Sequence, residues 1–458
     1  MMRSKKYGLE EAKLELLRRL QEETSGPGAP ASFPVVVRIK VPLIDIDPLL
    51  WLAGQRMRRK VFWHSSQTDL TVAGLGVVFE IAPEGWYGLN DAWDRATECM
   101  EACPEIRLFA GMSFARTVTG AEWNGFPAMR FILPAVEVVK DKEGVWLVVN
   151  AVRGRDGEAF SEQTKAVLEK MLVMEQVMPG ELLPVSREDV PDYEDWVCSA
   201  EAVLESLEKE GLEKVVLARR VSFELQGVCA PELVLKELME KQKADFFFLF
   251  SVDGASFLGL SSEPLYAREG LKVQSRAMAG GRPRGKDKVQ DDALRASLLT
   301  SDKDIKEHRL VAGALVEVFR EFCRSYQVDC EREVLRLTHH QCLLMRLSGV
   351  MSEGVTDKEF LQALHPASVV CGVPAEKARL FLQQYEVFDR GWFCGPVGFF
   401  SKTRTELAVA ARGCLFESGK LHVYAGAAFV KESDPLIQWE EAAREMKNIL
   451  NVVHGVRT

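Results

Sequence analysis

Short apolar segments, rich in β-branched and aromatic residues, recur along the chain and predict extensive β-sheet. In the first third of the chain they occupy residues 34–43, 74–82, 129–139 and 144–152. A second series of the same kind occupies residues 214–225, 245–252 and 256–262. Turn residues separate the segments, and this pattern is typical of strands with a buried face. Sheet therefore dominates both halves of the predicted structure.

Helical spacing appears before, between and after the strand series. Residues 8–22 place leucines among charges at helix-like intervals, and further helical stretches lie around 160–176 and 191–209. The segment 280–288, GGRPRGKDK, is the most loop-like interior stretch. The three stretches with helical spacing are therefore predicted to be helices.

The chain contains no low-complexity linker long enough to separate independent domains. Residues 1–195 are predicted to form the N-terminal part of a shared core, and residues 196–455 the catalytic region. Large α/β enzymes can reach 458 residues as a single unit. We therefore expect one intertwined structural domain.

Composition narrows the classes of partner. The net charge is −9 and no run of Lys and Arg forms a basic stripe, which argues against nucleic-acid binding. No segment approaches the roughly 20 apolar residues that span a bilayer. The ten cysteines lack repeated CxxC pairs, and no secretory signal precedes them. These features predict reduced thiols and a cytoplasmic location.

Two charged residues next to predicted strands are candidates for acid–base chemistry. Alternation along residues 214–221 places Lys214 on the same strand face as Val216, although from this segment alone a strand-edge lysine whose stem reaches water is the more ordinary interpretation. Glu263 follows the apolar segment 256–262, where it is either a turn residue or a desolvated acid with a raised pKa. Neither residue indicates acid–base chemistry unless other charged groups lie near it.

Two glutamates on predicted helices are candidates for binding a cation. Ser301 is expected to cap a helix on which Glu307 lies one turn before the apolar Val311, so its carboxylate extends the inner face. Asp434 is expected to cap the last helix, which carries Glu441. Oxygen ligands from two helices would suit Mg²⁺, which prefers oxygen and keeps several waters.

Nine segments, taken in order, resemble the chorismate-utilising enzymes. They are KVVLARRV (214–221), FLGLSSEPLY (257–266), AMAGGRPRG (277–285), LLTSDKDIKEHRLV (298–311), LHPASVVCG (364–372), FDRGWFCGPVGFF (388–400), ELAVAARG (406–413), YAGAAFV (424–430) and SDPLIQWEE (433–441). The resemblance covers about 196–453 and is weak over 1–195. It implies an α+β, layered fold like that of anthranilate synthase component I, with two large antiparallel β-sheets and peripheral helices.

The resemblance also implies roles for the four charged residues. Lys214 stands where water-using members of the family carry a general base, and Glu263 at the general-acid position. Glu307 and Glu441 stand at the positions of the Mg²⁺ ligands. The implied reaction is the reversible conversion of chorismate to isochorismate, by addition of water at C2 and loss of the C4 hydroxyl.

Further positions are assigned to the substrate by the same resemblance. Arg412 stands where the family anchors a substrate carboxylate, and His365 matches a histidine that lines the site. The remaining assigned residues form glycine-rich turns: Gly280, Gly281, Gly426, Ala427 and Ala428. Because Ala279 replaces a lysine that aminodeoxychorismate synthases use as a nucleophile, amination is disfavoured and no obligatory amidotransferase subunit is expected.

Several departures keep alternatives open. Gly281 and Ala428 differ from the usual family residues, and Glu445 stands where a substrate-facing lysine is usual. The leading hypothesis is an isochorismate synthase for menaquinone or a siderophore. The alternatives are a salicylate synthase, which also eliminates pyruvate, and a catalytically impaired regulatory protein that binds chorismate.

Overall fold

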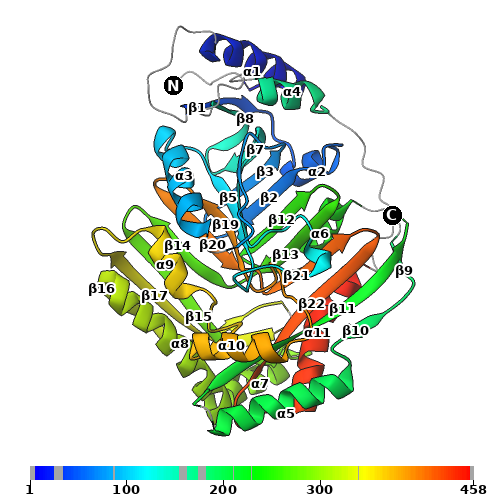
Figure 1. Ribbon diagram of the computed structural model, residues 1–458, viewed down its shortest axis with the longest axis vertical. Coiled ribbons are helices and arrows are strands. Elements are labelled where there is room, and N and C mark those ends of the chain that lie inside the picture. The colour runs from blue at the N-terminus through cyan, green and yellow to red at the C-terminus, as the bar shows by residue number, and fades with distance from the viewer. Residues whose placement is uncertain are drawn as a thin grey trace.

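A computed structural model describes residues 6–24, 35–85, 88–153, 162–173, 182–209, 211–227, 230–338 and 340–453. Within these residues two large antiparallel sheets form the centre of the molecule, and helices lie around them (Figure 1). The predicted fold class is therefore confirmed. Strand segments expected from the apolar pattern at 34–43, 144–152 and 214–225 are strands in the structure.

The larger sheet has 13 strands within the described residues. Its main path is β1 (Val35–Leu43), β8 (Gly144–Arg153), β7 (Val136–Asp141), β3 (Leu70–Leu75), β2 (Lys60–Ser65), β12 (Phe246–Val252), β13 (Ala255–Ser261), β21 (Arg412–Glu417), β22 (Lys420–Phe429), β11 (Lys214–Gln226) and β10 (Glu188–Val190). The short strands β9 (Leu183–Pro184) and β18 (Gly372–Val373) also pair with β11.

The smaller sheet has nine strands within the described residues. In order they are β16 (Cys323–Arg336), β17 (His340–Met351), β15 (Lys272–Pro283), β14 (Pro264–Glu269), β20 (Arg404–Val409), β19 (Pro396–Phe400), β5 (Leu108–Met112), β6 (Met129–Leu133) and β4 (Phe79–Ile81). Both sheets thus combine strands from the two halves of the sequence, since β2 pairs with β12 and β5 with β19.

Helices surround the sheets and gather at the end of the molecule that is lowest in Figure 1. They are α1 (Leu9–Thr24), α2 (Pro48–Ala53), α3 (Leu89–Ala102), α4 (Glu162–Lys170), α5 (Tyr193–Lys209), α6 (Pro231–Lys241), α7 (Lys288–Thr300), α8 (Asp302–Phe322), α9 (Asp357–Leu364), α10 (Ala375–Tyr385) and α11 (Pro435–Val453), with the 3-10 turn η2 (Ala121–Trp123). No described helix is long and apolar enough to cross a membrane.

Aromatic side chains and one buried carboxylate join the two sheets. The ring of Trp63 on β2 stacks on Phe246 at 5.3 Å and meets the edge of Phe399 on β19 at 6.4 Å. Glu406 on β20 accepts hydrogen bonds from Trp63 Nε1 at 3.1 Å and from Ser65 Oγ at 2.9 Å. These contacts fix one sheet against the other with little exposed surface between them.

Two local predictions are corrected by the structure. The segment 280–288 is not a continuous loop, because β15 runs to Pro283 and α7 begins at Lys288. Residues Gly426 to Ala428 do not form a turn, because they lie inside β22, paired with β11. Both segments are strands because they pair with residues distant in sequence, and local composition does not indicate such pairing.

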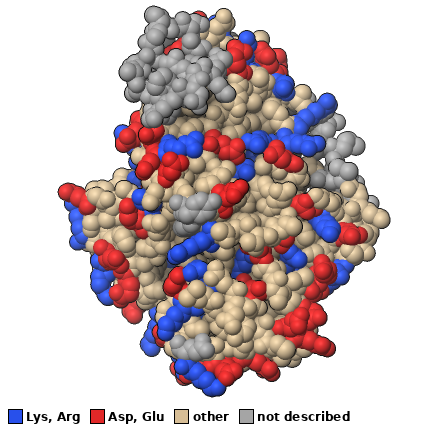
Figure 2. Space-filling model, in the orientation of Figure 1, with Lys and Arg blue, Asp and Glu red and all other residues tan. Residues whose placement is uncertain are grey.

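The surface carries mixed charge. Figure 2 shows Lys and Arg interspersed with Asp and Glu over one face, without a continuous basic stripe.

Candidate active site

A cavity of about 550 Å³ opens where the two sheets, α8 and α11 meet. The lower part of Figure 1 shows these elements together. Its walls include β11 and β22 from the larger sheet and β15 from the smaller one. Nine of the predicted site residues line it: Lys214, Glu263, Gly280, Gly281, Glu307, Arg412, Gly426, Ala428 and Glu441.

Lys214 is the first residue of β11 and is 1% exposed. Its ammonium lies 3.2 Å from Glu307 Oε1 and donates to the carbonyl oxygen of Val369 at 3.5 Å. The stem therefore does not carry the charge out to bulk water, which rules out the ordinary strand-edge reading. The alternation expected from the sequence holds, since Val216 lines the same cavity.

Glu263 lies between the end of β13 and the start of β14, and its backbone N–H donates to Ser261 Oγ at 3.0 Å. Burial raises the pKa of its carboxyl, while the charges of Arg412 and Lys214 act in the opposite direction. Its Oε2 is buried and has no hydrogen-bond partner among the described residues. The neutral acid is therefore favoured, as a proton donor requires.

Glu307 and Glu441 approach the cavity from two capped helices. Ser301 Oγ accepts from the backbone N–H of Asp304 at 3.3 Å, and Asp434 Oδ1 accepts from Leu436 N–H at 2.9 Å. Both predicted caps are confirmed. Glu307 is buried, and both carboxylates line the same cavity.

Loss of hydration raises the pKa of the Glu441 carboxyl, and repulsion from Glu307 and Glu445 raises it further. Glu441 keeps exposed surface. Since water still reaches this carboxyl, repulsion from the other carboxylates contributes more to its raised pKa than loss of hydration does. A cation between Glu307 and Glu441 would relieve this repulsion.

The donor set fits a hard divalent cation that is only partly held by protein. No cluster of three or more His, Cys, Asp or Glu at metal-binding distance occurs among the described residues. Two carboxylates remain, and Mg²⁺ commonly binds one or two carboxylates while substrate and water complete its shell. Glu307 and Glu441 therefore suit an ion that is completed by an anionic ligand.

Arg412, the first residue of β21, contacts two other side chains in the cavity wall. Its Nε lies 2.7 Å from Glu445 Oε2, and its Nη2 lies 3.0 Å from His340 Nε2. The neighbouring Arg444 lies 3.9 Å from Glu440. Arg412 neutralises the carboxylate of Glu445.

Two of the cavity glycines leave no room for a side chain. Gly280 has a φ of +66°, and a Cβ there would lie 2.8 Å from Asp304 Cβ. At Gly426 a Cβ would lie 3.1 Å from Val216 Cγ1. Both positions therefore let the backbone form the cavity wall directly.

Two predicted substrate contacts lie outside the cavity lining. His365 Nε2 contacts the carbonyl oxygen of Phe114 at 3.2 Å, and burial lowers the pKa of its ring to about 4. Ala427 is buried in β22, between the lining residues Gly426 and Ala428. For both residues, contact with the substrate stays a prediction.

The sequence analysis missed several polar residues of the lining, among them Gln438, His340 and Lys303. Gln438 is 2% exposed; its amide donates to the Ala428 carbonyl, and its Oε1 has no hydrogen-bond partner among the described residues. Its position three residues before Glu441 on the same helical face was a usable signal. His340 offered none, because its contact with Arg412 joins strands 72 residues apart.

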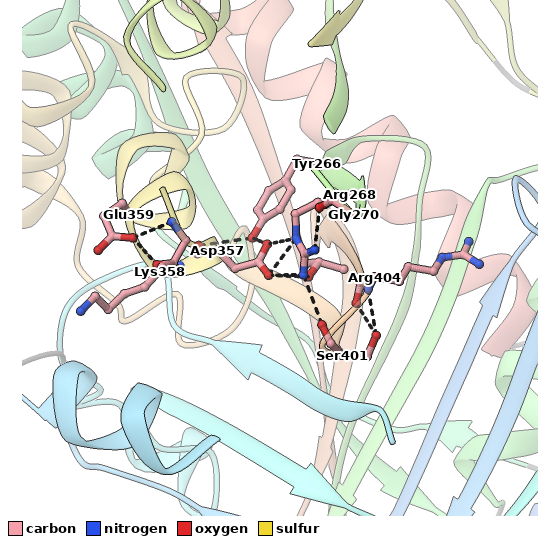
Figure 3. Close-up of polar contacts among 10 residues, drawn as sticks. Tyr266, Arg268, Gly270, Asp357, Lys358, Glu359, Ser401 and Arg404 are labelled. Carbon is pink, nitrogen blue, oxygen red and sulfur yellow. Dashed lines mark hydrogen bonds and ion pairs between the residues drawn. The ribbon is translucent and has the colours of Figure 1, made fainter. Parts of the chain in front are cut away.

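A buried ion-pair network joins α9 to the smaller sheet (Figure 3). Asp357, the first residue of α9, accepts from Arg268 Nη2 at 2.6 Å, from the Tyr266 hydroxyl at 2.9 Å and from Thr405 Oγ1 at 2.8 Å. Arg268 and Tyr266 belong to β14 and Thr405 to β20, so the network ties α9 to the smaller sheet. The segment after α9 supplies Val369 to the cavity.

Comparison with known proteins places the chain in a family. A family model described as "Chorismate binding enzyme" matches residues 26–454. The chain belongs to the chorismate-binding enzymes. The match begins far before residue 196, so the N-terminal region, weakly matched by motifs alone, is part of the family sequence.

Individual relatives within the chorismate-binding enzymes match over most of the chain. Isochorismate synthase MenF of Bacillus subtilis is 28% identical over 435 residues, covering 90% of this chain and 92% of that protein. Chloroplastic isochorismate synthase 2 of Arabidopsis thaliana is 32% identical and covers 82% of this chain and 69% of that protein.

The fold of the chorismate-binding enzymes is also seen among solved structures. The menaquinone-specific isochorismate synthase MenF from Escherichia coli superposes with a TM-score of 0.85 at 22% identity, covering 98% of this chain and all of that chain. Anthranilate synthase component I from Streptococcus pneumoniae gives 0.62 at 20% identity, covering 92% and 93%.

Proposed function

We propose that this protein is an isochorismate synthase, which converts chorismate reversibly to isochorismate. One observation carries the proposal: Lys214, Glu263, Glu307 and Glu441 converge on a single cavity of about 550 Å³. The relatives that match most of the chain, from Bacillus subtilis and Arabidopsis thaliana, bear this name. A cavity of this size suits a small dianionic ring compound.

The proposed chemistry assigns a separate task to each buried group. Lys214, as the neutral amine, accepts a proton from the water that attacks C2 of the ring, and Glu263 donates a proton to the departing C4 hydroxyl. The ring double bonds shift between these two events, so a hydroxyl enters at C2 as one leaves C4. Burial raises the pKa of Glu263, which favours the protonated form that this step needs.

Substrate carboxylates are assigned to the cationic side of the cavity. Arg412 binds one of them through its planar guanidinium, which suits a carboxylate. Glu307 and Glu441 are the residues that would hold Mg²⁺. When bound, the ion would offset the charge of the ring carboxylate and orient the substrate.

The test incubates purified protein with chorismate and MgCl₂, and resolves the products by chromatography with and without ammonium. Isochorismate as the single product supports the proposal. Salicylate with pyruvate would instead identify a salicylate synthase, and an aminated product would contradict the water-activating role of Lys214. Binding of chorismate without any product would reject the enzymatic assignment.

A further inference from the structure

The guanidinium of Arg412 is held on one side by two protein groups that have no assigned role. Glu445 on α11 contacts Nε at 2.7 Å, and His340 at the start of β17 contacts Nη2 at 3.0 Å. The side chains of Arg412 and Glu445 are only 22% and 27% exposed. The three residues line the same cavity and come from β21, α11 and β17.

The donors of Arg412 are divided between protein and cavity. A guanidinium has five N–H groups in one plane and accepts nothing, so the ring nitrogen Nε2 of His340 must be the acceptor in their contact. Glu445 contacts Nε and His340 contacts Nη2, so two of the three guanidinium nitrogens face protein groups. The remaining nitrogen, Nη1, is then the one that suits a ligand carboxylate.

Anchoring at two atoms restricts the plane of the guanidinium as well as its position. An arginine side chain loses considerable rotamer freedom when it is fixed, so a pre-oriented one binds its ligand with a smaller entropic penalty. Glu445 also places a negative charge near the binding end, which opposes an incoming carboxylate. If Glu445 mainly orients Arg412, its removal should weaken substrate binding. If it mainly repels the substrate carboxylate, its removal should strengthen binding.

We propose that Glu445 and His340 are positioning residues that orient Arg412 toward a substrate carboxylate. This inference rests on the proposed function, in which Arg412 binds chorismate. Glu445 fixes the Nε side of the fork and His340 the Nη2 side, so the Nη1 end faces the ligand. The negative residue at position 445 is then compatible with substrate binding, because its charge is already satisfied by Arg412.

The test compares Glu445→Ala with Glu445→Gln in steady-state kinetics. Glu445→Ala removes the ion-pair partner of Nε and should raise KM for chorismate about 10-fold, equivalent to about 1.4 kcal/mol, while kcat stays within about twofold. Glu445→Gln keeps an oxygen of the same reach beside Nε, so it should recover part of the lost affinity. The matched control is Glu440→Ala, because Glu440 is exposed on the same helix and pairs only loosely, at 3.9 Å, with Arg444.

A double-variant cycle separates positioning from general structure. In an Arg412→Lys background, Glu445→Ala should change KM little further, because its effect passes through the guanidinium. Lower KM in both Glu445 variants would show that Glu445 competes with substrate, and unchanged KM in Glu445→Ala would show that it does not hold Arg412. Either result overturns the inference.

Failure of the proposed function gives a different outcome. If the wild-type protein forms no isochorismate, calorimetric titration with chorismate still measures affinity for the wild type and both Glu445 variants. A weaker affinity in Glu445→Ala with recovery in Glu445→Gln supports positioning even then, whereas equal affinities reject it. Circular dichroism and thermal melts of each variant verify folding.

Discussion

Lys214 and Glu307 form an ion pair in which the lysine is almost fully removed from solvent, 1% exposed against 12% for the carboxylate side chain. Charges in such surroundings interact more strongly than on the surface, and breaking one of these pairs leaves the remaining charge costly. The pair therefore sets the local electrostatics of the cavity as well as the position of the proposed base.

Replacement of Lys214 by alanine should abolish most turnover while leaving chorismate binding largely intact. Loss of a general base typically lowers a rate by about 10²- to 10⁴-fold, so kcat should fall within this range. Chromatographic product assays and calorimetric binding measure the two quantities. Lys209→Ala is the control, because Lys209 is exposed and pairs with Glu205 on the same helix face. Undiminished turnover would remove Lys214 from the mechanism.

Glu263 predicts a pH-dependent change in stability. Its folded-state pKa is raised above the ordinary value of 4.5, so its contribution to stability is complete below that value and is lost as pH rises through the raised pKa. Glu263→Gln should therefore increase the free energy of unfolding at neutral pH by about 1 kcal/mol, the scale of an unsatisfied buried group.

The gain from Glu263→Gln should vanish below pH 4.5, where the wild-type carboxyl is protonated in both states. Denaturant unfolding of both proteins at neutral and acid pH measures it. A variant that is less stable than wild type at neutral pH would contradict the assigned burial cost. The same variant should lose turnover, because glutamine has no proton to donate.

For single residues, the sequence predicted the environment correctly where strand alternation or helical spacing applied. Strand alternation predicted the inward face of Lys214, and helical spacing predicted the burial of Glu307. The substrate contact predicted for Ala427 stays a prediction; the residue lies in β22 and is not among those that line the cavity. His340 escaped notice because its partner Arg412 is distant in sequence.

At the scale of elements, the helix α11 supplies the most polar wall of the cavity. Its first turn is capped by Asp434, and Gln438, Glu441 and Glu445 follow at intervals of three and four residues. This arrangement was readable from the sequence as far as the cap and the shared face of Glu441 and Glu445. What α11 packs against was not readable, because the contacts with β22 depend on the fold.

The network around Asp357 in Figure 3 predicts a large loss of stability on its disruption. Asp357→Asn removes the charge that Arg268 needs, and breaking a buried ion pair typically costs about 3–5 kcal/mol. Chemical denaturation measures this loss. The control is Asp292→Asn, whose partner Arg336 is largely exposed and whose ion pair should contribute at most about 1 kcal/mol. Equal losses in both variants would show that the network braces nothing.

At the scale of the whole molecule, each sheet joins a block of strands from residues 35–153 to a block from residues 188–429. Neither half has a complete sheet of its own, since removal of residues 1–195 would expose the edges of β12 and β19. The sequence supported a shared core through the absence of a linker. It did not reveal which strands pair, because pairing across about 200 residues leaves no local pattern.

A single cooperative unfolding transition is expected, because each sheet contains strands from both regions of the chain. Near-ultraviolet circular dichroism, tryptophan fluorescence and calorimetry should give coincident midpoints, because rupture of the β2–β12 pairing disturbs both halves. A fragment of residues 196–458 expressed alone should not fold. Two separated transitions, or a soluble and cooperatively folding fragment, would instead indicate independent domains.

The pairing of β11 with β22 also has a consequence during translation. Lys214 is synthesised about 200 residues before the residues of β22 that pair with β11. Glu441 is synthesised later still. While the chain is still on the ribosome, the residues that surround Lys214 in the folded cavity have not all been synthesised. Pairing of strands so far apart in sequence is slow. Chorismate cannot meet a finished pocket until α11 has emerged from the exit tunnel.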